Sequence, residues 1–85
     1  MIQQTVTINQ KAGLSPQPVN QLVQTASQFQ ADIFLTHNGR RVNAKSVLGI
    51  LSLAIPMREE IILEAAGEDE NEALQEVINT LNRLV

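Results

Sequence analysis

The chain has 85 residues, an apolar content of 44% and a formal net charge of −3, which fits one domain with one core and leaves no room for a second. It has no cysteine, which excludes disulfides and thiolate chemistry, and its basic residues are scattered except at Arg40-Arg41, which argues against a nucleic-acid interface. We find no signal-peptide pattern, and no apolar run approaches the ~20 residues of a membrane span. We expect a single cytoplasmic domain over residues 1–85.

A strand and a helix are predicted first. In residues 2–8, Ile2, Val6 and Ile8 share one side of an alternating pattern that is typical of a half-buried strand. Ser15 can then cap a helix, and the prolines at positions 16 and 18 suit its first turn, where backbone amides lack intrahelical partners. Four apolar residues with helical spacing give this helix one buried face: Val19, Leu22, Val23 and Ala26.

A hairpin is predicted next. Residues 32–36 form a second strand, in which Phe34 points away from the side of its apolar neighbours. The pair Asn38-Gly39 favours a tight turn, so residues 41–43 form a short third strand. His37, the only histidine, is interpreted as a surface residue of this turn. A single histidine cannot build a metal cluster, and we predict neither a metal site nor a cofactor.

The segment Asn43–Ile55 predicts a charged turn, then Ser46 as a helix cap, and then a helix that is apolar on nearly all sides and that Pro56 ends. Ile50 and Leu53 can point into a core. A second apolar side, with no obvious core to fill, holds the remaining large residues: Val47, Leu48 and Leu51. Either nearby loops cover this side, or it is a partner-binding patch with Ser46 at its edge.

The last part of the chain predicts a strand and a helix. Residues 60–66 alternate as a fourth strand. Asp69 and Glu72 resemble a capping box at the start of the last helix. An apolar stripe runs along that helix through Leu74, Val77, Ile78, Leu81, Leu84 and Val85. The order β-α-β-β-α-β-α, with strands joined by hairpins, predicts an α+β fold of two layers, in which helices cover one face of a sheet.

Three segments resemble the HPr family, small proteins of the bacterial phosphoenolpyruvate-dependent sugar phosphotransferase system. Gly13-Leu14 followed by Pro18 resembles the family's active-site segment G-[IL]-H-A-R-P, and residues 42–49 resemble its regulatory serine segment. Residues 64–70 with Ala73-Leu74 resemble its last strand and helix. The resemblance covers the whole chain. It implies an open-faced sandwich, in which an antiparallel four-stranded sheet of order 1-4-2-3 carries three helices on one face.

The resemblance breaks at the position where the family's carriers hold their phosphate. Ser15 stands in the place of the active-site histidine, Pro16 replaces a residue with a backbone N–H, and Gln17 replaces an arginine. A serine phosphate ester is far more stable than the phosphoramidate through which a histidine hands its phosphoryl group on. We therefore predict no catalytic residue and no enzymatic activity.

A carrier scaffold that keeps its regulatory serine is similar to the catabolite-repression HPr-like branch of the family, Crh. This resemblance implies that HPr kinase/phosphorylase modifies Ser46, and that the modified protein is a cofactor of a LacI-type catabolite control regulator. We predict that four neighbouring residues bind partners: Lys45, Val47, Leu48 and Leu51. A phosphate on Ser46 would meet the amides and the positive dipole end of a helix, with a lysine adjacent.

Two other functions stay open. One is a phosphotransferase carrier. The other is an HPr-like binding module co-opted to an unrelated partner, with Ser46 kept only as a helix cap; Gln17 favours it, because the Crh branch keeps an arginine there that helps to contact the regulator. Phe34 and Ile62 are expected on the uncovered face of the sheet, where they either pair across strands or seed a dimer. We expect a monomer or a weak homodimer.

Overall fold

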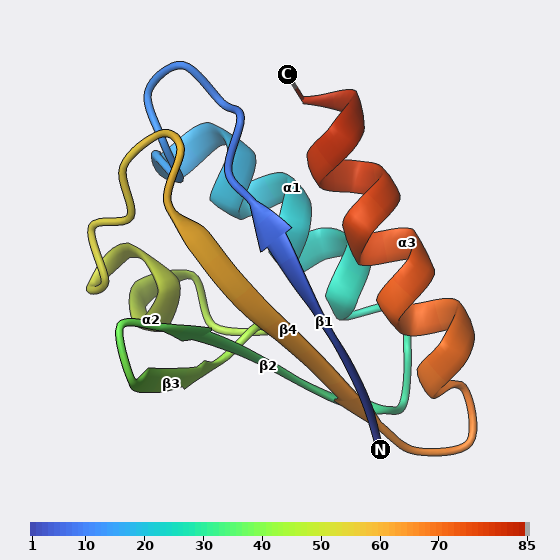
Figure 1. The fold of residues 1–85 in the computed structure, drawn as a ribbon. Helices are drawn as coiled ribbons and strands as arrows, with labels where there is room; N and C mark the ends of the chain where they lie inside the picture. The colour runs from blue at the N-terminus through green and yellow to red at the C-terminus, as the bar shows by residue number, and fades with distance from the viewer. Residues whose placement is uncertain (85) are drawn as a thin grey trace.

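The computed structural model describes residues 1–84 as one sheet with helices on one of its faces (Figure 1). The elements are β1 (Ile2–Thr7), α1 (Pro16–Ala26), β2 (Asp32–His37), β3 (Arg40–Asn43), α2 (Val47–Leu51), β4 (Glu60–Ala66) and α3 (Glu70–Arg83). All paired strands are antiparallel, and the sheet order is β1-β4-β2-β3. The predicted α+β fold, including the order 1-4-2-3, is confirmed.

The core lies between the sheet and the long helices α1 and α3, which lie side by side (Figure 1). Alternate residues of the central strands and the apolar stripes of both helices supply it, and the largest fully buried side chains are Ile8, Leu22, Ile33, Leu35, Ile50, Ile61, Leu63, Val19 and Val77. Burying one such side chain is worth about 1.5–3 kcal/mol. The predicted stripe of α3 is buried through Leu81, Leu84 is half-buried, and Val85 lies outside the described residues.

The β2–β3 hairpin turns at Asn38 and Gly39, which have φ angles of 50° and 79°, as the sequence predicts. The assignment of His37 to the surface of this turn is wrong. His37 is the last residue of β2 and only 7% exposed, and its Nε2 lies 3.2 Å from Glu59 Oε1. The reason is the alternation of the strand, which places residue 37 on the same side as the buried Leu35.

Helix α2 begins after Ser46 as predicted, but it has only five residues and ends well before Pro56. Asn43 is the last residue of β3, also as predicted. At its end the backbone tightens, because the N–H of Leu53 donates to the carbonyl of Ile50, and Ala54 then turns with a φ of 49°. This turn lets both Leu53 and Ile55 point into the core, where both are buried. A helix continued through these residues could not bury both side chains.

The predicted capping box of α3 is also wrong. Asp69 is the N-cap residue, but its side chain makes no capping bond, and Glu72 is exposed. Glu70 reaches back instead, and its Oε1 accepts a hydrogen bond of 3.1 Å from the N–H of Gly67. The carboxylate of Asp69 is bound elsewhere, by the loop between α1 and β2.

On the uncovered face of the sheet, Phe34 and Ile62 are not direct partners. Phe34 lies opposite Glu64, whereas Ile62 lies opposite Thr36. Arg41 covers the Phe34 ring instead: its guanidinium carbon lies 3.7 Å from the ring centroid, and its Nε lies 3.3 Å from Glu64 Oε1. The expected cross-strand pair is therefore replaced by a stack that holds a charged side chain over the aromatic ring.

Candidate functional site

Ser46 is placed between strand β3 and helix α2. It is the N-cap residue of α2, with extended backbone angles of φ −113° and ψ 111°, and its Oγ accepts a hydrogen bond of 3.0 Å from the N–H of Gly49. The predicted capping role is confirmed. Gly49 makes room for this geometry, because a Cβ at position 49 would lie only 3.1 Å from Ser46 Oγ. The side chain of Ser46 is half-buried.

The apolar residues beside Ser46 are less exposed to solvent than the sequence suggested. Leu48 is 81% exposed, but Val47 and Leu51 are half-buried and pack against the core. The expectation that all three lack a core to fill is therefore wrong for two of them. The exposed parts of Val47 and Leu51 still adjoin Leu48. The predicted partner-binding patch is therefore smaller than expected, and its centre is Leu48.

Lys45 does not extend into solvent beside Ser46. Its Nζ donates a hydrogen bond of 2.7 Å to the carbonyl oxygen of Phe29, in the loop between α1 and β2, and its backbone N–H donates to Asn43 Oδ1 at 2.8 Å. The ammonium group is thus already bound within the protein. No sequence pattern indicates this contact, because Phe29 accepts through its backbone carbonyl oxygen.

The start of α1 offers little for holding an anion. Ser15 is its N-cap residue and is extended, but its side chain makes no capping hydrogen bond. The first and third helical positions are prolines, so only Gln17 among these three carries a backbone N–H. The N–H of Val19 donates to the carbonyl of Ser15 at 3.1 Å.

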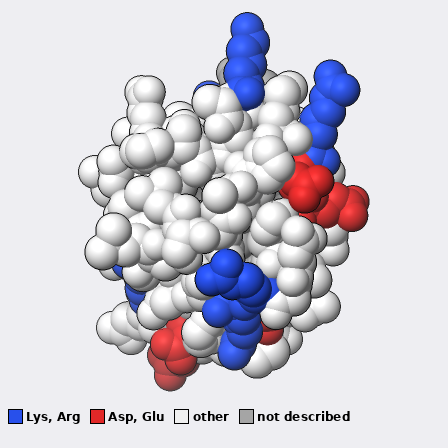
Figure 2. Space-filling view, turned by 90° about the vertical axis from the view of Figure 1, so that its left-hand side faces the viewer, with Lys and Arg blue, Asp and Glu red and all other residues white. Residues whose placement is uncertain are grey.

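The start of α1 lies against the segment that follows α2. The N–H of Leu14 donates to the carbonyl of Ile55 at 2.9 Å, and Gly13, with a φ of 67°, leaves no space for a Cβ beside Ile55 and Pro56. Figure 2 shows the side of the molecule that carries α2 and this segment: Lys and Arg side chains stand apart around a broad area without charge. Leu48 and Met57, which is 38% exposed, are the exposed large apolar side chains of α2 and of this segment.

Comparisons with known proteins identify the family to which this sequence belongs. The family described as PTS HPr component phosphorylation site matches residues 2–83. The HPr-like protein Crh of Bacillus subtilis (strain 168) is 46% identical over 77 residues, 91% of each chain. The chain belongs to the HPr family.

Solved structures of HPr and Crh proteins have the same fold. The crystal structure of HPr-C-His from Thermoanaerobacter tengcongensis matches with a TM-score of 0.95 and 36% identity, over 99% of this chain and 94% of that one. The crystal structure of Bacillus subtilis Crh matches with a TM-score of 0.78 and 42% identity, over 100% and 98% of the two chains, and that protein is described as a dimer with a swapped domain. The resemblance to HPr and Crh is confirmed.

As a member of the HPr family, the chain brings its two characteristic segments to one side. Ser15 and Gln17 lie at the start of α1, and Ser46 lies at the start of α2. The backbone hydrogen bond from the N–H of Leu14 to the carbonyl of Ile55 joins the two regions. Among residues 1–84, no group of three or more His, Cys, Asp or Glu side chains is placed to hold a metal ion. No described helix combines the length and the apolar character needed to cross a membrane.

Polar contacts that sequence reasoning missed lie beside this site. Asp69 accepts the N–H groups of Gln30 and Ala31 at 2.9 and 2.8 Å, and the pKa of its carboxyl is lowered, chiefly by the bond from Gln30. The pKa of Glu70 is lowered by the N–H of Gly67 and by the N-terminal ammonium group. The sequence shows both acids at the start of α3, and the predicted capping box had Asp69 bind an amide of that helix. Asp69 instead binds the loop between α1 and β2.

Proposed function

We propose that this protein is a non-catalytic HPr-like regulator of carbon catabolite control, phosphorylated on Ser46 by HPr kinase/phosphorylase and then acting as a cofactor of a LacI-type transcriptional regulator. A contrast within one fold carries this proposal. Ser46 is an ordered helix cap beside the exposed Leu48, whereas the start of α1 has Ser15 in place of the histidine, Pro16 without an N–H and Gln17 in place of the cation. We place the protein in the cytoplasm, where the kinase and the regulator act.

The proposed modification is a simple phosphoryl transfer. The γ-phosphoryl group of ATP passes to Ser46 Oγ, the hydroxyl proton is released, and ADP leaves. The product carries about −1.5 to −2 charges at neutral pH. Helix α2 has only five residues, and one of its amides already binds Ser46 Oγ, so the new charge acts chiefly on the surface around Leu48. Arginine side chains of a partner can bind it through charge-assisted hydrogen bonds.

Incubation with HPr kinase/phosphorylase and ATP, followed by mass mapping, tests the modification. We expect phosphate on Ser46 and none on the Ser46→Ala variant. Ser52→Ala is the matched control, because Ser52 flanks the other end of the same helix, is exposed, and donates its hydroxyl hydrogen to the carbonyl of Gly49 at 2.6 Å. If Ser46→Ala takes up phosphate as well as the wild type, the proposal is wrong.

Binding of the phosphorylated protein to the regulator tests the second half of the proposal. Gln17 replaces a positive charge, and a hydrogen bond to a charged group is worth about 1.5–3 kcal/mol. We therefore expect Gln17→Arg to tighten binding roughly 10–100-fold. If neither the phosphorylated wild type nor the phosphorylated Gln17→Arg variant binds the regulator, the co-opted binding module becomes the better account.

Self-association is part of this proposal. The swapped domain described for Bacillus subtilis Crh supports an exchange between monomer and dimer here. The first strand, β1, lies at the edge of the sheet and carries neither charge nor proline, which are the usual protections of an edge. Sedimentation at rising concentration should show a growing dimer fraction; a single monomer species throughout would contradict it.

A further inference from the structure

One peptide group in the loop between α1 and β2 is held between two opposite charges. The carbonyl oxygen of Phe29 accepts a hydrogen bond of 2.7 Å from Lys45 Nζ. The N–H of Gln30, which belongs to the same peptide group, donates to Asp69 Oδ2 at 2.9 Å, and the next N–H, that of Ala31, donates to Asp69 Oδ1 at 2.8 Å. We call Lys45, Asp69 and the Phe29–Gln30 peptide the loop clamp.

The loop clamp is arranged for electrostatic attraction. The negative end of the peptide dipole faces the ammonium group, and its positive end faces the carboxylate, so both hydrogen bonds are charge-assisted and roughly twice as strong as neutral ones. The pKa of Asp69 lies below its ordinary value, first because the N–H of Gln30 donates to it, and in part because of the charge of Lys45. Both charges therefore stabilise the same loop conformation.

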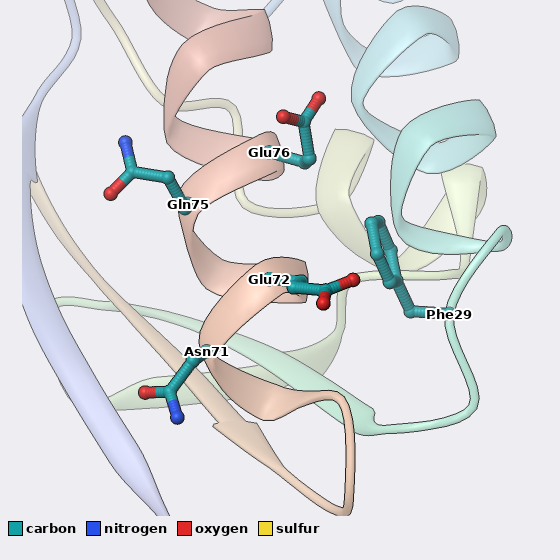
Figure 3. A pocket seen from close by; sticks show the side chains of 5 residues that line it. All are labelled: Phe29, Asn71, Glu72, Gln75 and Glu76. Carbon is teal, nitrogen blue, oxygen red and sulfur yellow. The ribbon is translucent and has the colours of Figure 1, made fainter.

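The clamp connects the proposed regulatory serine to helix α3. Lys45 directly precedes Ser46, whereas Asp69 is the N-cap residue of α3. The ring of Phe29 points toward the first turns of α3 (Figure 3). There it lines a groove of about 520 Å³ together with Asn71, Glu72, Gln75 and Glu76. The position of Phe29, and so the shape of this groove, depends on a peptide that Lys45 holds.

We propose that Lys45 is a switchable clamp: a phosphate on Ser46 draws its ammonium group away from the Phe29 carbonyl, which loosens the loop and reshapes the groove beside α3. This inference rests on the proposed phosphorylation of Ser46. A phosphate adds about −1.5 to −2 charges on the neighbouring residue. It binds an ammonium group more strongly than a neutral carbonyl does, because both partners are then charged. One modification thereby changes two surfaces.

The test uses the full chain made by chemical ligation with phosphoserine at position 46, so that it does not depend on any kinase. Amide resonances and hydrogen-exchange rates of Gln30 and Ala31 are compared between the modified and unmodified proteins. We expect both resonances to shift and both amides to exchange faster on phosphorylation. Lys45→Met should produce the same changes without phosphate, and phosphoserine should add little more to it. Lys11→Met is the matched control, since Lys11 is the other lysine and is exposed.

The outcomes separate this inference from the proposed function. If phosphoserine shifts only residues of α2 and leaves Gln30 and Ala31 unchanged, the switch is wrong, even where the kinase modifies Ser46. If Lys45→Met leaves both amides unchanged, Lys45 does not hold the loop and the inference also fails. If the kinase leaves Ser46 unmodified while synthetic phosphoserine moves the loop, the proposed function fails and the clamp stands.

Discussion

The starts of α1 and α2 carry the same residue in the same backbone state, with different results. Ser15 and Ser46 are both N-cap residues with extended backbone, but only Ser46 uses its hydroxyl to bind a helix amide. The third residue after each serine explains the difference. It is Gly49 in α2, whose N–H reaches Ser46 Oγ at 3.0 Å, and Pro18 in α1, which has no N–H to give.

This contrast shows how one fold can lose one site and keep another. At the start of α1 the prolines leave the backbone helical while removing two of the first three N–H groups that could hold an anion. At the start of α2 the glycine leaves both an amide donor and the space for the serine side chain. The predictions below are designed to break this contrast or to sharpen it, beginning with the largest expected effect.

Phosphoryl transfer from phosphoenolpyruvate through enzyme I should fail on the wild-type protein. Ser15→His alone should restore little, because an amide donor and a cation are still missing, each worth about 1.5–3 kcal/mol, or roughly 10–100-fold. The triple variant Ser15→His/Pro16→Ala/Gln17→Arg should recover most of the transfer. The assay measures acid-labile phosphate, and its appearance on the wild type would overturn the contrast.

Gly13→Ala should destabilise the protein more than Gly39→Ala. Both glycines have positive φ angles, of 67° and 79°, which cost a residue with a Cβ about 1–2 kcal/mol. At position 39 the Cβ meets nothing, whereas at position 13 it collides with the backbone of Ile55 and Pro56, which adds about 1–3 kcal/mol. Urea unfolding measures the difference. Equal losses would mean that the start of α1 is not fixed by the segment after α2.

Ser46→Ala should lower the free energy of unfolding by about 1 kcal/mol, the usual value of a capping serine. Ser15→Ala should change it by less than about half as much, because its hydroxyl caps nothing. Pro18→Ala supplies the missing N–H, so in that background Ser15→Ala should become costly. Chemical denaturation of the wild type and of these four variants decides; a large loss for Ser15→Ala in the wild-type background would contradict the assignment.

Stability should also fall in acid below about pH 5, and by less than in the substitutions above. The pKa values of Asp69 and Glu70 are lowered in the fold, so these groups stabilise the protein above their unfolded pKa values, near 3.9 and 4.3, and this contribution is lost as the pH falls through their folded values. Asp69→Asn should flatten the decline below about pH 5. Asp32→Asn, which removes a carboxylate at an exposed site, is the control.

Much of the fold followed from local patterns. Alternation along β4, helical spacing along α1 and α3, and the turn at Asn38 and Gly39 are set by residues close in sequence, and each forms where predicted. The capping hydrogen bond between Ser46 and Gly49 is also a local feature, because its two residues are only three positions apart. His37 also followed the alternation of β2, and its burial could have been predicted by extending that pattern by one residue.

The sequence by itself thus determined the elements and their order, but it predicted a capping role for Ser15 that the structure does not show. The tertiary structure alone decided which partners the polar side chains take and where α2 ends. Lys45 reaches the Phe29 carbonyl and Asp69 reaches the Gln30 amide across separations of 16 and 39 residues, through backbone groups that every sequence offers alike. Helix α2 stops after Leu51, because burying Leu53 and Ile55 in a core built by distant strands and helices is worth more than further helical turns.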